Sequence, residues 1–180
     1  QTIPAKVIGN SVHRPNNLIT LDKGTADGVA DDMGVACGTG VVGIVYLTSA
    51  HYSVVLPVLN EKSNISCAIQ GRGYFGYLHW NGGLTDEAYL DDVPRHAKFE
   101  IGDTIVTSGY SSVFPGGLMV GTVTEQLDSR DGLTYRLKVR LATDYAQLRN
   151  VSVIRYTHRE EQAVLEEKAA ETLNMEVKKQ

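Results

Sequence analysis

The 180-residue sequence has few of the residues that would tie a small domain together covalently or hold it in a membrane. It contains two cysteines, Cys37 and Cys67, which are too few for a disulfide framework. Each lies in an apolar, strand-like run, where a thiol usually behaves as a small buried hydrophobe. The sequence does not decide whether the two cysteines form a disulfide bond with each other. No run of about 18 apolar residues is present, so we expect no membrane-spanning helix in this stretch of chain.

Strong charge and clustered metal ligands are also lacking. The formal net charge is -4, which provides no positive field for nucleic acid or an anionic lipid surface. A zinc site is not expected, because no clustered pair of histidines accompanies the two cysteines. The glycine-rich stretch 22–34 contains Asp31 and Asp32 but not the ligand spacing of a calcium loop. The Gly-x-Gly-x-x-Gly pattern at 71–76 precedes strand and turn residues instead of the helix that would hold a pyrophosphate, so no cofactor is predicted.

What the sequence does contain favours strands and turns. It has 18 Gly and 9 Tyr with many Val and Ile, and its short β-branched runs between turn residues predict about a dozen strands. The clearest is 135–141, whose odd positions are apolar and whose even positions form a basic row of Arg136, Lys138 and Arg140. That row either meets an acidic partner or forms a solvated outer face.

Two other segments carry weaker signals. Residues 88–90 predict a short strand and 93–96 a loop. From residue 157 onward, Glu, Lys, Ala and Leu favour a helix. A helix of this length is marginal in water unless it docks, so we predict a frayed helical tail.

The densest aromatic cluster consists of Tyr74, Phe75, Tyr77 and Trp80. Alternate positions of a strand face opposite ways, so these side chains cannot all enter one core. We predict that most of these rings pack inside a barrel and that at least one pair is exposed. All four residues are candidates for binding a protein partner.

The most informative stretch runs from Gly102 to Val123. A Gly-Asp turn opens it, a short β-branched strand follows, and Ser-Gly ends the strand because glycine tolerates positive φ. In the next loop Phe114 can be buried, Pro115 fixes φ, and two glycines reverse the chain into a second strand. This order of strand, glycine turn, aromatic-proline-glycine loop and strand is unusual enough to be informative.

The chain resembles the rod shape-determining protein MreC family. The resemblance rests on 102–123, on blocks at 21–29 and 40–45, and on a closing strand at 151–154, all in the family's order. It implies an all-β fold in which two small six-stranded β-barrels lie side by side, which periodicity alone does not distinguish from a sandwich. The expected domains are a first barrel over 1–67, to which a closing strand near 151–156 returns, a second barrel over 68–156, and a helical or disordered tail over 157–180.

The resemblance also implies a function. It implies a non-enzymatic scaffold of the bacterial cell-elongation machinery, which makes lateral peptidoglycan and maintains rod shape. The implied partners are a class B penicillin-binding transpeptidase, the MreD and MreB complex, and further copies of the same protein, with no nucleic acid. The framework residues implied to be structural are Gly24, Gly28, Gly43, Gly102, Asp103, Thr107, Ser108, Gly109, Phe114, Pro115, Gly117 and Gly121.

The location implied by the resemblance is periplasmic or extracytoplasmic. In this family an N-terminal helix anchors the protein to the inner membrane. This chain begins without an initiator Met or a signal peptide, so we expect it to be a fragment from which that helix is absent.

A chymotrypsin-like serine protease is the alternative, because that class is also built from two six-stranded barrels. His51, then an aspartate (Asp91, Asp92 or Asp103), then Ser108 follow the chain order His, Asp, Ser. Chain order is weak support, since a triad is defined by geometry. Ser108 also lacks the Gly-Asp-Ser-Gly-Gly context whose backbone supplies the oxyanion hole. We therefore predict that the protein is not an enzyme.

Overall fold

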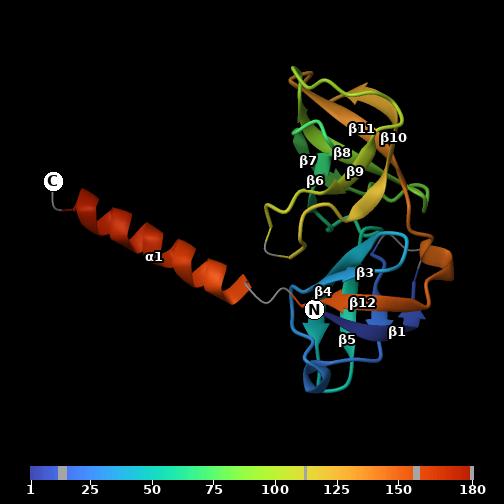
Figure 1. The fold of residues 1–180 in the computed structure, drawn as a ribbon. Helices are drawn as coiled ribbons and strands as arrows, with labels where there is room; N and C mark the ends of the chain where they lie inside the picture. Colours follow the sequence, from blue (N-terminus) through green and yellow to red (C-terminus); the bar gives the residue numbers. More distant parts are fainter. Residues whose placement is uncertain (12–15, 112, 156–158, 179–180) are drawn as a thin grey trace.

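Strands from both ends of the chain meet in this structure, a computed structural model that describes residues 1–11, 16–111, 113–155 and 159–178. The described residues form two closed barrels of six strands each and one C-terminal helix (Figure 1). All strand pairings are antiparallel. Full closure leaves neither barrel with a free strand edge.

The first barrel combines N-terminal strands with the last strand of the chain. Its order around the barrel is β1-β12-β3-β4-β5-β2, so β12 lies between β1 and β3. A short 3₁₀ turn, η1 (Thr25–Asp27), connects β2 to β3. The strands are β1 (Thr2–Asn10), β2 (Ile19–Leu21), β3 (Gly34–Ala36), β4 (Val41–Thr48), β5 (Ser53–Pro57) and β12 (Asn150–Ile154).

The second barrel lies between β5 and β12 in the sequence, with the order β10-β11-β8-β7-β6-β9. The boundary expected at residue 67 falls inside β6, whose partners are β7 and β9, so the chain crosses between the barrels before Ile65. The division into two domains and a tail otherwise stays a proposal. The strands are β6 (Ile65–Ile69), β7 (Phe75–His79), β8 (Glu87–Pro94), β9 (Thr104–Thr107), β10 (Met119–Asp128) and β11 (Thr134–Leu141), and η2 (Tyr145–Gln147) leads on to β12.

The alternating pattern of β11 gives the strand one apolar face inside the barrel and one charged face outside it. Leu137 and Val139 are fully buried inside the barrel. On the outer face, Arg136 Nε lies 3.1 Å from a carboxylate of Asp91 on β8, and Lys138 Nζ lies 3.1 Å from Glu125 on β10. Two residues of the basic row are therefore already paired with acidic residues on the neighbouring strands. The basic row is part of a solvated outer face.

One expected loop is partly a strand. The segment 93–96, which the sequence suggests is a loop, begins inside β8, which runs from Glu87 to Pro94. The pairing of β8 with β11 shifts register between Tyr135 and Leu137, so β8 carries a bulge there. An extra residue interrupts the alternation of side chains, and this concealed the length of the strand.

Both barrels place glycine where two strands approach closely. A Cβ added at Gly43 of β4 would overlap the carbonyl oxygen of Leu56 on β5. A Cβ at Gly121 of β10 would overlap the carbonyl oxygen of Arg140 on β11. Glycine inside a strand commonly marks such an approach of backbone to backbone.

Side chains from the second half of the chain join the two barrels. Tyr145 is 2% exposed and its hydroxyl donates to the carbonyl oxygen of Val41 at 3.0 Å, a carbonyl that also accepts a 3.0 Å hydrogen bond from Thr143. Burial raises the pKa of Tyr145, which keeps this donor protonated. Phe114, also 2% exposed, packs on β3, where a Cβ at Gly34 would lie 2.5 Å from its ring.

The two cysteines are free and lie in different barrels. Cys67 on β6 is fully buried, and burial raises the pKa of its thiol to about 12. Cys37 follows β3, and its sulfur lies 3.3 Å from the Thr39 hydroxyl and 3.7 Å from that of Thr143. The structure therefore contains no bridge between them.

The helix α1 (Arg159–Val177) projects away from the barrels (Figure 1). Its apolar residues are exposed, among them Leu165 at 66% and Leu173 at 63%. No helix in the described part of the chain combines the length and apolar character needed to cross a membrane. Residues 157 and 158, the start of the expected tail, lie outside the described residues.

Deleting residues 157–180 should leave the thermal midpoint of the barrels within about 2 °C of the parent, because exposed side chains contribute little to folding. Far-UV circular dichroism recorded during a thermal scan measures both the midpoint and the accompanying loss of helical signal. A midpoint lowered by about 5 °C or more would mean that α1 packs against a barrel in solution.

Candidate partner-binding surface

Strand β7 presents its odd-numbered side chains outward. Gly76 and Leu78 are buried, whereas Phe75 is 38% exposed and Tyr77 is 50% exposed. Residues two apart on a strand share a face, so the two rings lie beside each other on the outer wall of the second barrel. Exposed aromatic rings grouped in this way are typical of protein-binding surfaces.

A third ring comes from the loop between β9 and β10. Tyr110 is 72% exposed, and its ring stands edge-on to Phe75 with 4.6 Å between the centroids and 87° between the planes. Edge-to-face packing of this kind is a favoured aromatic geometry. We call Phe75, Tyr77 and Tyr110 the aromatic surface.

Hydrogen bonds from the end of β9 hold the loop that carries Tyr110. The Thr107 hydroxyl donates to the carbonyl oxygen of Pro115 at 2.7 Å and accepts from the Leu118 amide at 2.9 Å, which ties both sides of the loop together. The Tyr110 amide donates to the Ser108 hydroxyl at 3.2 Å. With Phe114 packed on the first barrel, the loop is held at both ends, so Tyr110 is presented in a defined position.

Two of the four aromatic residues expected to bind a partner are turned inward. Trp80 is 3% exposed and its indole N–H donates to the carbonyl oxygen of Leu84 at 2.9 Å, so the expectation that it binds a partner is wrong. Tyr74 is half-buried against the core and packs edge-on to His96 at 5.8 Å. Because alternate residues of a strand face opposite sides, an outward Phe75 places Tyr74 and Trp80 on the inner face. Nothing in the sequence pattern pointed to Tyr110, which lies far along the chain in a loop.

The other framework residues lie in turns and where strands approach closely. Gly24 and Gly28 flank η1, and Gly109 and Gly117 take positive φ in the β9–β10 loop. Gly102 precedes Asp103, whose carboxylate accepts from the Glu100 amide at 2.9 Å and pairs with Arg72 at 3.1 Å. The Glu100 hydrogen bond, followed by Arg72, holds the pKa of Asp103 below its usual value. The structural role of the whole framework stays a prediction.

The residues of the protease alternative do not form a triad. His51 lies in the turn between β4 and β5 of the first barrel. Ser108 lies at the end of β9 in the second barrel, and its hydroxyl lies 2.8 Å from that of Ser66. Asp91 pairs with Arg136 and Asp103 with Arg72, not with His51. The protease alternative is not supported.

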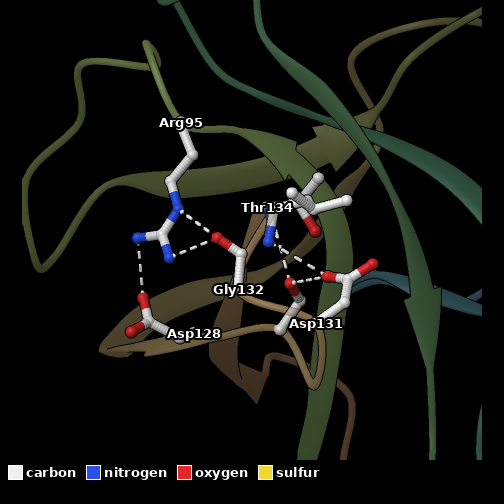
Figure 2. Close-up of polar contacts among 7 residues, drawn as sticks. Arg95, Asp128, Asp131, Gly132 and Thr134 are labelled. Atoms are coloured by element: carbon white, nitrogen blue, oxygen red, sulfur yellow. Dashed lines mark hydrogen bonds and ion pairs between the residues drawn. The ribbon is translucent and has the colours of Figure 1, made fainter.

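At the tip of the β10–β11 hairpin, the polar groups satisfy one another (Figure 2). Arg95, just after β8, donates to Asp128 at 2.7 Å and to the carbonyl oxygen of Gly132 at 3.0 and 2.7 Å. The carboxylate of Asp131 accepts from the Ser129 hydroxyl at 2.7 Å. Both carboxylates at this tip therefore have internal partners.

Known proteins resemble the chain over the region that contains both barrels. The profile of one family, described as rod shape-determining protein MreC, barrel core, matches residues 7–155. The chain belongs to the MreC family. The cell shape-determining protein MreC of Listeria monocytogenes is 30% identical over 154 residues, which cover 84% of this chain and 52% of that protein. The chain spans about half the length of the curated relatives it matches.

Solved structures of MreC share the two-barrel fold. MreC from Listeria monocytogenes has a TM-score of 0.80 at 28% identity, covering 87% of this chain and 76% of that chain. The major periplasmic domain from the cell shape-determining filament MreC has a TM-score of 0.72 at 24% identity, covering 85% and 94%. A complex between penicillin-binding protein PBP2 and MreC from Helicobacter pylori matches with a TM-score of 0.64 at 17% identity, covering 86% and 99%. The expected family and the expected all-β fold are confirmed.

Proposed function

We propose that this chain is the extracytoplasmic barrel segment of a non-enzymatic scaffold that positions a class B penicillin-binding transpeptidase during cell elongation. Membership of a family named for cell shape supports the general role. The Helicobacter pylori complex supports the class of partner, because it joins an MreC protein to a penicillin-binding protein. A scaffold acts by binding alone, so its effect on the enzyme is to shift or hold a conformation.

The observation that carries this proposal is the exposed aromatic surface on the second barrel. Large exposed rings at the centre of an interface commonly supply most of the affinity. Phe75 and Tyr110 support each other edge-on before any partner arrives, so little ordering cost falls on them during binding. The surface therefore has the chemistry and the preorganisation of a docking site for a protein.

Further contacts of the intact protein belong to the same proposal. We propose that it associates with itself, with MreD in the membrane and with MreB across it, and that an anchor in the inner membrane holds it in place. The description of one MreC structure as the periplasmic domain of a filament supports both the compartment and self-association.

We expect this chain to bind the soluble domain of its cognate class B transpeptidase with a micromolar Kd, measured by isothermal titration calorimetry. Joining two copies of the chain should raise the apparent affinity by about 10² or more through avidity. The Phe75→Ala/Tyr110→Ala double variant should bind at least about tenfold more weakly, because it removes two central anchors.

Tyr52→Ala is the matched control. Tyr52 is a 53% exposed tyrosine on the first barrel, so its loss should leave the Kd unchanged. Equal binding by the parent and the folded double variant would place the interface elsewhere. Absence of binding even by an artificially dimerised parent would overturn the proposed function.

A further inference from the structure

The outer wall of the second barrel contains an arginine held between a tyrosine ring and a carboxylate. The guanidinium carbon of Arg136 lies 4.0 Å from the ring centroid of Tyr89, and its Nε lies 3.1 Å from the carboxylate of Asp91. The ring and the carboxylate come from β8 and the cation from β11. A cation over an aromatic face next to an acid is a stabilised arrangement, especially where it is partly shielded from water.

A second arrangement of the same composition lies near the hairpin tip. The guanidinium carbon of Arg95 lies 4.6 Å from the ring centroid of Tyr135, and its Nη1 lies 2.7 Å from Asp128. The ion pair with Asp128 is visible in Figure 2. This barrel therefore uses one combination of tyrosine, carboxylate and arginine twice.

A third tyrosine of this barrel has carboxylates beside it, and its ring has no cation-π contact among the described residues. Tyr77 lines a hollow of about 350 Å³ that is also lined by Asp92 and Glu61. Within the described residues, neither of these carboxylates has a hydrogen-bond or ion-pair partner. Lys62 and His79 also line the hollow, and the Lys62 ammonium pairs with no carboxylate among the described side chains.

The bulge in β8 gives its two neighbouring aspartates different surroundings. Asp91 pairs with Arg136 on the adjacent strand. Asp92 has a φ of 64°, a left-handed conformation that β-strands otherwise avoid, and it is exposed at the hollow. A bulge commonly re-aims a side chain in this way.

We propose that this hollow receives an arginine or lysine side chain of the protein that docks on the aromatic surface. The proposal rests on the proposed function above and adds the chemistry of the partner: an apolar patch that covers Phe75 and Tyr110, with a basic side chain next to it. Tyr77 belongs to both features, so the hollow is continuous with the aromatic surface.

Charge complementarity favours a cationic side chain as the occupant. Asp92 and Glu61 supply two unpaired negative charges, and the Tyr77 ring supplies a face for a guanidinium or ammonium group. A metal ion fits less well, since no group of three or more potential metal ligands occurs in the described part of the chain. The hollow therefore has the tyrosine and the carboxylates of the two filled arrangements, and the partner would supply the cation.

The test measures binding of the 180-residue chain to the soluble domain of the cognate transpeptidase. The double variant Asp92→Asn/Glu61→Gln removes both charges with little change in shape, and asparagine tolerates the left-handed backbone at position 92. We expect its Kd to rise about tenfold. Raising the salt from about 50 to 300 mM should weaken binding by the parent more than binding by the variant, because salt screens the two charges that only the parent carries.

Two controls separate this effect from net charge and from Lys62. Asp128→Asn changes an exposed aspartate that already has Arg95 as a partner, so its Kd should stay within about twofold of the parent. Lys62→Met should leave binding unchanged or strengthen it, because it removes a competing cation. A parent that binds while the double variant binds equally well would overturn this proposal and leave the proposed function intact. A loss with Lys62→Met as large as that of the double variant would also overturn it. No binding by the parent would overturn both.

Discussion

Replacing Phe114 with alanine should lower the free energy of unfolding by about 3–5 kcal/mol, the usual cost of removing a buried phenylalanine. Phe114 is 2% exposed and packs against Gly34 of the first barrel, so the cavity would open between the barrels. The same loop carries Tyr110, and we expect the variant to bind the transpeptidase more weakly as well. Urea denaturation followed by tryptophan fluorescence and circular dichroism measures the change in stability.

Tyr110→Ala is the control for this prediction, since it removes an aromatic ring from the same loop. Tyr110 is 72% exposed, so its loss should change the free energy of unfolding by no more than about 0.5 kcal/mol. If the free energy of unfolding falls by the same small amount in both variants, Phe114 does not hold the barrels together.

The Gly121→Val substitution should lower the free energy of unfolding by about 3 kcal/mol or more. This loss equals or exceeds the usual cost of forcing extra atoms into a packed core. Any Cβ at Gly121 would overlap the carbonyl oxygen of Arg140 and would lie 2.7 Å from a methyl group of Val139. A backbone oxygen in a strand cannot move without breaking the ladder between β10 and β11. The thermal midpoint of the purified variant, or its failure to accumulate as soluble protein, measures the effect.

Gly38→Ala provides the comparison. Among the described residues other than its two chain neighbours, none places an atom within 4 Å of a Cβ built at Gly38, and the φ of Gly38 is not in the left-handed range. This substitution should therefore change the midpoint by about 2 °C or less. A Gly121→Val variant as stable as Gly38→Ala would show that β10 and β11 are farther apart in solution.

Regular alternation and turn chemistry made much of the fold predictable. The strand 135–141 is predictable because its side chains alternate, and the loop with Phe114 because proline and glycine fix its turns. The full length of β8 is not predictable from the sequence, because Asp91 and Asp92 break the alternation. A bulge is recognised by its partner strand, and that pairing is a long-range property.

The candidate site was only partly predictable for the same reason. Phe75 and Tyr77 share a strand face, so the local pattern sufficed to group them. Tyr110 reaches Phe75 because β9 pairs with β6, which in turn pairs with β7, and no short-range signal records that adjacency. The pairing of Arg136 with Asp91 likewise depends on the neighbouring strand. Contacts of this kind require the topology.

The position of β12 between β1 and β3 has a consequence for biosynthesis. A ribosome makes the chain from its N-terminus, so all strands of the second barrel have been made before β12 exists. About 97 residues separate the end of β5 from the end of β12, which corresponds to roughly 5–20 s of translation. Throughout that interval the facing edges of β1 and β3 have no strand between them, and open edges invite pairing with other chains. The first barrel to begin is thus the last to close.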